Sequence, residues 1–300
     1  MNRVKSSLTE NVWQTLCWFD VFGQAASLEE IHRFLFWQKA SEKEVERVLK
    51  KDPRIGSSFG FYFLRRKNAS VLARCGRQFQ SGKLWRRVLR HLFLFRLTPF
   101  LRLAAVGNTL AMGWPEKNSD IDLLIIAQKN RLFTARFFLT LWTQIFRMRR
   151  HGHKISGRFC LSFFLAKDSL DLEKLKIGAH DPYLAFWVTT LIPLYGDSAD
   201  FFAANTWVQQ YFPNAKLATT AKKIRGKTLL EKMLSGHVGN GLERSLQKWQ
   251  LKRATKKQKS KRKNTVVISD EVLKFHETDR REYFLREWRK RVSAGSKAKK

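Results

Sequence analysis

Residues 107–126 have the sequence GNTLAMGWPEKNSDIDLLII, in which a glycine and a turn-forming segment precede two aspartates and an apolar run. Because successive side chains of a strand point to opposite faces, Asp120 and Asp122 are expected on one face, directed into the same small volume. Two neighbouring carboxylates repel each other and are costly to bury without compensating positive charge. The pattern therefore predicts either a cation in front of them or a solvated strand entrance in which Asp120 caps the turn after Ser119.

Magnesium is the cation that best suits such a pair. It accepts carboxylate oxygens and keeps its other positions for phosphate and water. Two ions held in this way can stabilise the entering and leaving oxygens of a phosphoryl transfer. Gly107, at the end of the preceding apolar segment, permits backbone amides to approach a phosphate closely.

The composition indicates an anionic partner. The chain has 300 residues, 44% of them hydrophobic, which suffices for two or three small domains, and its formal net charge is +33. Such a charge favours nucleic acid, nucleotide or a membrane surface as partner. No acidic residue occurs between Asp52 and Glu116, and residues 248–263 carry nine basic residues and no acid.

Cysteine usage and hydropathy limit the other classes of protein. Cys17, Cys75 and Cys160 are far apart, which argues against a zinc site or a disulfide framework and fits a reducing cytoplasm. The N-terminal residues lack the apolar core of a signal peptide. The most hydrophobic segments, 137–146 and 184–196, are too short to span a bilayer. We therefore expect a cytoplasmic protein with no integral membrane segment.

The N-terminal part, residues 1–68, has the pattern of a winged helix. Three Ser-x-x-Glu patterns predict the starts of three helices, at Ser7–Glu10, Ser27–Glu30 and Ser41–Glu44. Residues 54–67 alternate around a Gly-Ser turn and predict a hairpin. Such a domain either binds nucleic acid or serves protein contacts and structure, and the mixed charge of the third helix leaves both alternatives open.

The rest of the chain predicts a mixed α/β (α+β) fold. Residues 69–98 form a basic helical connector with a break near Ser81 and Gly82, ended by Pro99. The expected core comprises residues 99–215, with strands at 100–107, 121–127 and 158–166 and helices at 131–150, 180–192 and 200–211. Residues 216–300 form a basic helical C-terminal region with a flexible arm near 252–264.

In this order of elements, Gly107 followed by Asp-x-Asp on a strand resembles the DNA polymerase beta-type nucleotidyltransferase superfamily. The stretches GNTLAMG, SDIDLLI and CLSFF are similar to that family's glycine loop, metal-binding strand and later strand. PLYGD, ANTWVQQYFPN and FHETDRRE resemble the C-terminal half of uncharacterised bacterial proteins that join a winged helix to a nucleotidyltransferase domain.

The resemblance implies nucleotidyl transfer from a Mg²⁺-bound nucleoside triphosphate (NTP) to an unknown acceptor, possible acceptors including RNA. It implies that Asp120 and Asp122 are the catalytic metal ligands. It also implies that Gly107, Asn108 and Arg136 bind phosphate.

Two departures from the family pattern support an alternative. Asn108 replaces the usual serine of the glycine loop. Active members also carry a third carboxylate on the later strand, where this chain is expected to present Arg158, Cys160, Ser162 and Phe164 on one face. Asp168 and Asp171 lie beyond that strand. The alternative is a catalytically decayed nucleotidyltransferase fold that acts as a non-enzymatic nucleic-acid-binding protein.

Both alternatives need a surface for a polyanion, RNA or DNA. The candidate residues are basic and come from the connector and the C-terminal arm: Arg74, Arg77, Lys83, Arg86, Arg87, Arg90, Lys256, Lys257, Lys261 and Arg262. The amphipathic helix expected at 131–150 either covers the sheet or lies on an anionic membrane.

Overall fold

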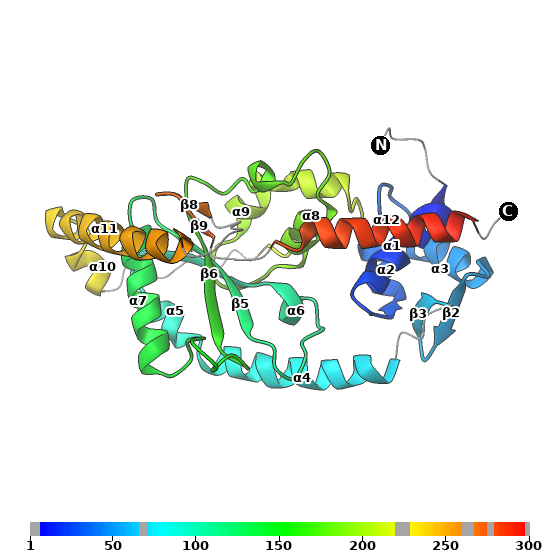
Figure 1. Cartoon of the computed structure of the whole chain (residues 1–300), viewed down its shortest axis with the longest axis horizontal. Coiled ribbons are helices and arrows are strands. Elements are labelled where there is room, and N and C mark those ends of the chain that lie inside the picture. Colours follow the sequence, from blue (N-terminus) through cyan, green and yellow to red (C-terminus); the bar gives the residue numbers. More distant parts are fainter. Residues whose placement is uncertain (1–6, 66–70, 220–228, 260–266, 275–278, 298–300) are drawn as a thin grey trace.

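A computed structural model describes residues 7–65, 71–219, 229–259, 267–274 and 279–297 of the chain (Figure 1). The fold is mixed α/β with two sheets, as the sequence predicts. The helices are α1 (Leu8–Val21), α2 (Leu28–Arg33), α3 (Glu42–Lys51), α4 (Val71–Arg90), α5 (Phe93–Leu97), α6 (Asn108–Ala111), α7 (Leu132–Ile145), η1 (Glu173–Leu175), α8 (Pro182–Thr190), α9 (Ala199–Ala204), η2 (Thr206–Gln210), α10 (Leu229–Met233), α11 (His237–Lys259) and α12 (Arg281–Lys297). The strands are β1 (Ala26–Ser27), β2 (Ile55–Ser58), β3 (Phe61–Leu64), β4 (Leu101–Val106), β5 (Ile121–Ala127), β6 (Phe159–Ala166), β7 (Ile192–Gly196), β8 (Val267–Ile268) and β9 (Val272–Lys274).

The N-terminal unit consists of α1–α3 and an antiparallel sheet in the order β1-β3-β2. Its helices begin where the serines predict. Ser27 and Ser41 form complete capping boxes with the glutamates three residues later, and Ser7 accepts a hydrogen bond from the backbone N–H of Glu10. These side chains satisfy amides that the first helical turn leaves without partners.

The larger sheet has the order β7-β4-β5-β6-β9-β8. Strands β5 and β6 are parallel, joined by the crossover helix α7, and the other neighbouring pairs are antiparallel. From Leu123 to Ala127, β5 is buried throughout, which explains its unbroken apolar run. Asp122 is the polar residue of this strand, and Asp120 lies just before the strand begins.

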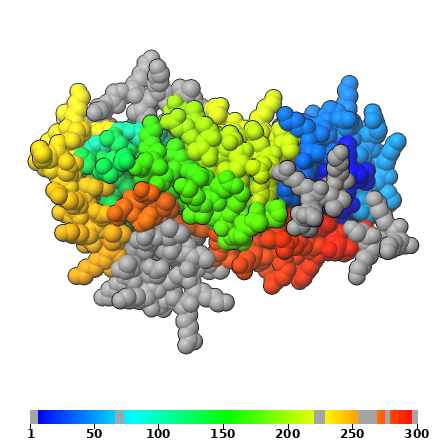
Figure 2. All heavy atoms as spheres, turned by 90° about the horizontal axis from the view of Figure 1, so that it is seen from above, coloured from blue at the N-terminus to red at the C-terminus, as the bar shows by residue number. Residues whose placement is uncertain are grey.

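One hydrophobic core joins the N-terminal unit to the larger sheet. Trp18 of α1 is fully buried, and its ring lies 5.8 Å from that of Phe186 on α8 and 5.8 Å from that of Trp288 on α12. The indole N–H of Trp288 donates a hydrogen bond to the backbone oxygen of Gln14. Helix α12, red in Figures 1 and 2, accordingly lies along the N-terminal unit and beside the segment that carries α8. The boundary expected near residue 68 therefore does not separate two independent cores.

A second core covers the opposite face of the larger sheet, with α5 and α7 packed over it. Helix α4 runs along the molecule from the N-terminal sheet to α5 (Figure 1). Within the described part of the chain, no helix has both the length and the apolarity to cross a membrane.

The expected break near Ser81 and Gly82 is wrong. Helix α4 continues through both residues, and the chain leaves it only at His91, just before α5. A glycine inside a helix costs about 1 kcal/mol, which buried apolar contacts such as those of Leu84 and Val88 offset. The stop before Pro99 is confirmed, since α5 ends at Leu97.

Two other helix boundaries differ from the expectation. Helix α7 ends at Ile145, and residues 146–150 instead turn back so that Arg150 N donates to the backbone oxygen of Phe159. Helix α11 continues to Lys259, so residues 252–259 of the expected flexible arm are helical. This stretch contains no glycine or proline and is rich in lysine, arginine and glutamine, which favour helix. The remainder of the arm, 260–264, lies outside the described residues.

Candidate functional site

Two carboxylates and a thiol meet where β5 and β6 begin. Asp122 pairs with Cys160 across the parallel strands, and one ligand atom each from Asp120, Asp122 and Cys160 lie within 4.8 Å of one another. The expectation that the two aspartates share one small volume is confirmed. All three side chains could contribute to a cation site, two as oxygen ligands and one as sulfur.

A bulge in β6 changes which residues of that strand face the aspartates. Between the pairs Asp122–Cys160 and Leu124–Phe163, β6 contains one residue more than β5. The alternation is therefore reversed after Cys160. Phe163 packs in the core on the aspartate side and Phe164 in the core of the opposite face, so the expectation that Phe164 shares the face of Cys160 is wrong.

No third carboxylate joins the pair among the residues that the structure describes. Ser162, next to the cluster, accepts a hydrogen bond from the thiol of Cys160 at 3.3 Å. Asp168 forms an ion pair with Lys129 at 3.0 Å, and Asp171 accepts a hydrogen bond from the backbone of the η1 segment. Both carboxylates therefore interact with groups outside the cluster.

Gly107 and Asn108 contact the aspartates from the end of β4. The backbone N–H of Gly107 donates to the backbone oxygen of Asp122 at 3.0 Å. A Cβ atom at Gly107 would lie 3.1 Å from the indole nitrogen of Trp187 and 3.2 Å from Leu191, so the close approach of α8 accounts for this glycine. The side-chain amide of Asn108, at φ +53°, donates to Asp122 Oδ2 at 2.7 Å.

Arg150 neutralises one of the two carboxylates. Its guanidinium donates to Asp120 Oδ2 at 2.6 Å and lies 3.5 Å from the sulfur of Cys160. The Arg150 side chain is 44% exposed and that of Asp120 is 17% exposed, so the ion pair lies at the rim of the cluster. Ion pairs with this much exposure contribute about 0–1 kcal/mol, and a competing cation can displace such an arginine.

The ionised form of the second carboxylate, Asp122, is electrostatically unfavourable in the folded protein. Burial and the neighbouring Asp120 raise the pKa of Asp122 from 3.8 to about 6, although the hydrogen bond from Asn108, the nearby side chain of Cys160 and the charge of Arg150 act in the opposite direction. Burial, with Asp122 as the next cause, also raises the pKa of the Cys160 thiol to about 12. The same two causes raise the pKa of Tyr183 on α8 to about 12. The site therefore has unbalanced negative charge centred on Asp122.

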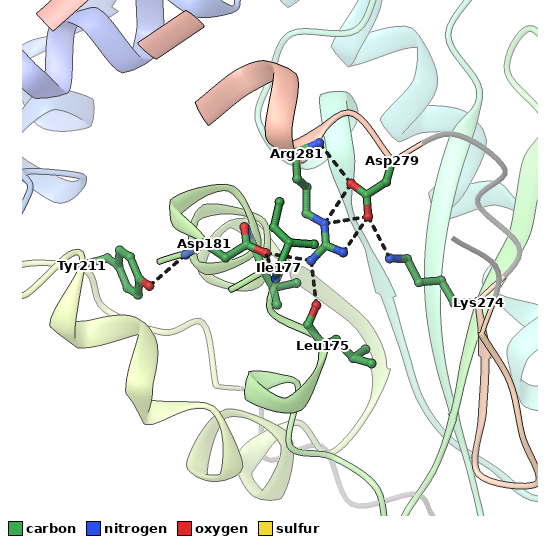
Figure 3. A network of polar contacts seen from close by, with 8 residues as sticks. Leu175, Ile177, Asp181, Tyr211, Lys274, Asp279 and Arg281 are labelled. Carbon is green, nitrogen blue, oxygen red and sulfur yellow. Dashed lines mark hydrogen bonds and ion pairs between the residues drawn. The ribbon is translucent and has the colours of Figure 1, made fainter. Parts of the chain in front are cut away.

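A buried network of charges holds α8 in its place beside the site (Figure 3). Arg281, at the start of α12, donates to Asp181 at 2.7 Å and to the backbone oxygen of Leu175. Asp181 in turn caps α8 through the N–H of Leu184. Burial alone would raise the pKa of Asp279, but its hydrogen bonds with Arg281 lower it to about 2. The network fixes the start of the helix that carries Tyr183 and Trp187.

Arg136 does not join this cluster, so its expected role as a phosphate ligand there is wrong. It lies on α7, over the opposite face of the sheet, with its guanidinium above the ring of Phe164. It donates a hydrogen bond to the side chain of Gln250 on α11. The helical spacing of the sequence cannot show which face of the sheet a crossover helix covers.

The basic residues predicted to bind nucleic acid differ in exposure and in position. Arg74 is only 6% exposed and pairs with Glu30 while donating to the backbone oxygen of Ala25, so its assignment to a nucleic-acid surface is wrong. Arg77 is partly buried against Gly23. Four residues of α4 are exposed: Lys83, Arg86, Arg87 and Arg90. The helix α11 carries Lys256 and Lys257, whereas Lys261 and Arg262 lie outside the described residues.

Arg150 and Tyr183 complete the site without having been predicted from the sequence. Arg150 belongs to a basic segment, FRMRRHGH, that follows an apolar helix pattern, but no sequence signal links it to Asp120, thirty residues earlier. Tyr183 follows the Asp-Pro start of a helix that is apolar all around. Comparison of the chain with family models, curated proteins and solved structures found no match.

Proposed function

We propose that the chain is a nucleotidyltransferase that binds an NTP with Mg²⁺ at Asp120 and Asp122. One observation carries the proposal: two carboxylates converge at the edge of a sheet, and burial together with their mutual repulsion raises the pKa of one of them to about 6. An arrangement that is costly in the protein alone is favourable once a divalent cation is bound.

The site provides the oxygen ligands and the negative charge that a divalent cation requires. Asp120 and Asp122 would be the ligands, and bound Mg²⁺ would neutralise charge on the triphosphate. Asn108 would orient Asp122 through the hydrogen bond at Oδ2. Arg150 would leave Asp120 and pair with a phosphate instead, since guanidinium groups bind phosphate oxygens well. Cys160 lies close enough to bind a thiophilic ion but is a poor ligand for magnesium.

The proposed reaction joins an acceptor hydroxyl to the α-phosphorus of the NTP. The oxygen–phosphorus bond forms as the bond between the α-phosphorus and its bridging oxygen breaks, and pyrophosphate leaves with the bonding electron pair. Asp122 would hold the cation, and the hydroxyl proton would pass to solvent, since no third carboxylate joins the pair among the described residues.

The N-terminal unit supports a nucleic-acid-binding role. Its element order, α1-β1-α2-α3-β2-β3 with the sheet order β1-β3-β2, supports the winged helix expected from the sequence. The exposed side of α3 has both acidic and basic residues, so binding by this helix alone is expected to be weak.

A non-enzymatic nucleic-acid-binding protein is the second candidate. Two observations favour it. Arg150 forms an ion pair with Asp120, and β6, the strand on which a third carboxylate is expected, has Cys160 and Ser162 beside the aspartates. In this case Arg150 acts as a permanent substitute for the metal ion.

The two candidates differ in label transfer. The wild-type protein and the Asp122→Asn variant are incubated with each α-³²P-labelled NTP, Mg²⁺ and total RNA, sheared DNA or a protein extract. Transfer of label to one of these pools by the wild type, with loss in the variant, supports the enzyme. Equal residual label for both proteins in all pools supports the second candidate.

A further inference from the structure

Two adjoining grooves lined by arginines lie where α4 meets the segment between α7 and β6. The first, of about 580 Å³, lies between the last turns of α4 and residues 146–148. The second, of about 510 Å³, is lined by residues 144–158. Arg147 and Arg158 line both grooves, so the two form one continuous surface, which we call the arginine groove. Figure 1 shows the green segment that precedes β6 lying against α4.

The charge of the arginine groove is uniform. Its lining includes Arg86, Arg87, Arg90, Arg147 and Arg158, and no aspartate or glutamate. Arg86, Arg90 and Arg147 are exposed and take part in none of the ion pairs found between described residues. A concave surface with this charge attracts an extended chain of phosphates.

Exposed aromatic rings border the same surface. Phe146 lines the first groove and is 44% exposed, and its ring lies 5.0 Å from that of Phe93, which is 38% exposed. The imidazole of His91 is stacked on Phe93 at 6.2 Å. Exposed rings beside arginines can stack with unpaired bases. The bases of a duplex are stacked on each other and are not accessible to such rings.

The segment that lines the second part of the arginine groove also contacts the aspartate pair. Arg149 and His151 line the groove, whereas Arg150 between them lines neither part of it and donates to Asp120 Oδ2. Where the groove segment ends, the backbone N–H of Gly157 donates to the backbone oxygen of Ser119 at 2.8 Å. The groove and the aspartate pair therefore lie on two sides of the same short segment, residues 149–151.

We infer that the arginine groove binds single-stranded nucleic acid. Binding by the groove is independent of any reaction, whereas use of the strand as acceptor rests on the proposed function. An anionic membrane is disfavoured because the arginines line a concavity, where a flat array of lipid headgroups makes poor contact.

The experiment compares two variants of equal charge. The groove variant is Arg86→Gln/Arg90→Gln/Arg147→Gln, and the control variant replaces three exposed arginines of α11 and α12, Arg244→Gln/Arg286→Gln/Arg289→Gln. Fluorescence anisotropy measures Kd against salt concentration, without metal or NTP, for fluorescein-labelled oligo(U), oligo(dT) and a duplex. Vesicles of phosphatidylglycerol and phosphatidylcholine provide the membrane arm.

For single strands the groove variant is expected to bind about tenfold more weakly, with a salt slope shallower by about 2, because each lost phosphate contact removes about 0.7. The control variant should keep the wild-type slope. Equal losses in both variants would overturn the inference, as would duplex binding as tight as single-strand binding. Loss of vesicle binding with unchanged oligonucleotide binding would assign the groove to a membrane instead.

Phe146→Ala provides an independent test, because it retains every charge. It should weaken single-strand binding about tenfold and leave vesicle and duplex binding unchanged. If this substitution has no effect on single-strand binding, stacking is refuted, even if the triple variant misfolds. If the protein binds single strands but no Mg²⁺–NTP, the nucleic-acid groove is supported and the nucleotidyltransferase proposal is refuted. If it binds Mg²⁺–NTP but no single strands, the nucleotidyltransferase proposal is supported and the groove inference is refuted.

Discussion

Replacement of Asp122 by asparagine is expected to stabilise the metal-free protein. The folded protein raises the pKa of this carboxyl from 3.8 to about 6, which corresponds to a cost of about 3 kcal/mol in the ionised state at neutral pH. Asparagine has nearly the same shape, carries no charge, and its side-chain oxygen can still accept the hydrogen bond from Asn108. The expected gain in unfolding free energy at pH 7.5 is therefore about 1–3 kcal/mol.

The gain should depend on pH in a defined interval. A carboxyl whose pKa is higher in the folded protein than in the unfolded chain lowers stability as the pH rises from the unfolded value, 3.8, to the folded value, about 6. The advantage of Asp122→Asn should thus be greatest and constant above about pH 6. At pH 4.5 it should fall to about 1 kcal/mol or less.

Guanidinium unfolding followed by circular dichroism measures this difference at pH 4.5 and 7.5, in EDTA and again with Mg²⁺ and ATP. Asp168→Asn is the matched control, because Asp168 forms a surface ion pair with Lys129 and should change stability by about 1 kcal/mol or less at both pH values. Added Mg²⁺–ATP should stabilise the wild type at pH 7.5 and have no effect on Asp122→Asn. A metal-free variant that is less stable than the wild type at pH 7.5 would refute the claim that Asp122 carries uncompensated charge.

Four further substitutions test other parts of the structure. Arg150→Gln should strengthen Mg²⁺ binding by up to about fivefold in a calorimetric titration, because it removes the cation that competes at the rim of the site; unchanged or weaker binding would contradict displacement. Arg281→Met should lower the unfolding free energy by about 3–5 kcal/mol, because it leaves buried acids unpaired. It should also remove the loss of stability on acidification from about pH 4 to 2 that protonation of Asp279 causes in the wild type, as acid unfolding would show. Gly107→Ala should lower the melting temperature because its Cβ meets the indole of α8, whereas Gly82→Ala, in an open part of α4, should add about 1 kcal/mol; the reverse order would contradict the packing.

Local patterns in the sequence predicted the starts of helices and the position of the aspartates. Ser27 and Ser41 form their capping boxes through contacts only three residues away, so sequence alone contains the information. The same holds for Asp120 and Asp122, because the strand period of two places both on one face without reference to other elements. A glycine in α4 misled the prediction, because its local cost is outweighed by packing against distant residues.

Features that depend on distant parts of the chain were missed. The bulge in β6 reverses its side-chain alternation, and nothing in the run FCLSFFLA marks the extra residue. The pairing of Arg74 with Glu30 and of Arg150 with Asp120 joins elements whose relative position the sequence does not encode locally. The shared core around Trp18 likewise appears only once α8 and α12 are in place.

Isothermal titration of ATP in the presence of Mg²⁺ tests the central claim most directly, with the wild type compared with Asp120→Asn/Asp122→Asn at pH 7.5. Saturable binding to the wild type that EDTA abolishes is expected, with at least a tenfold loss of affinity in the double variant. Equal affinities for the two proteins would contradict the claim, because the aspartate pair would then hold no metal-bound nucleotide.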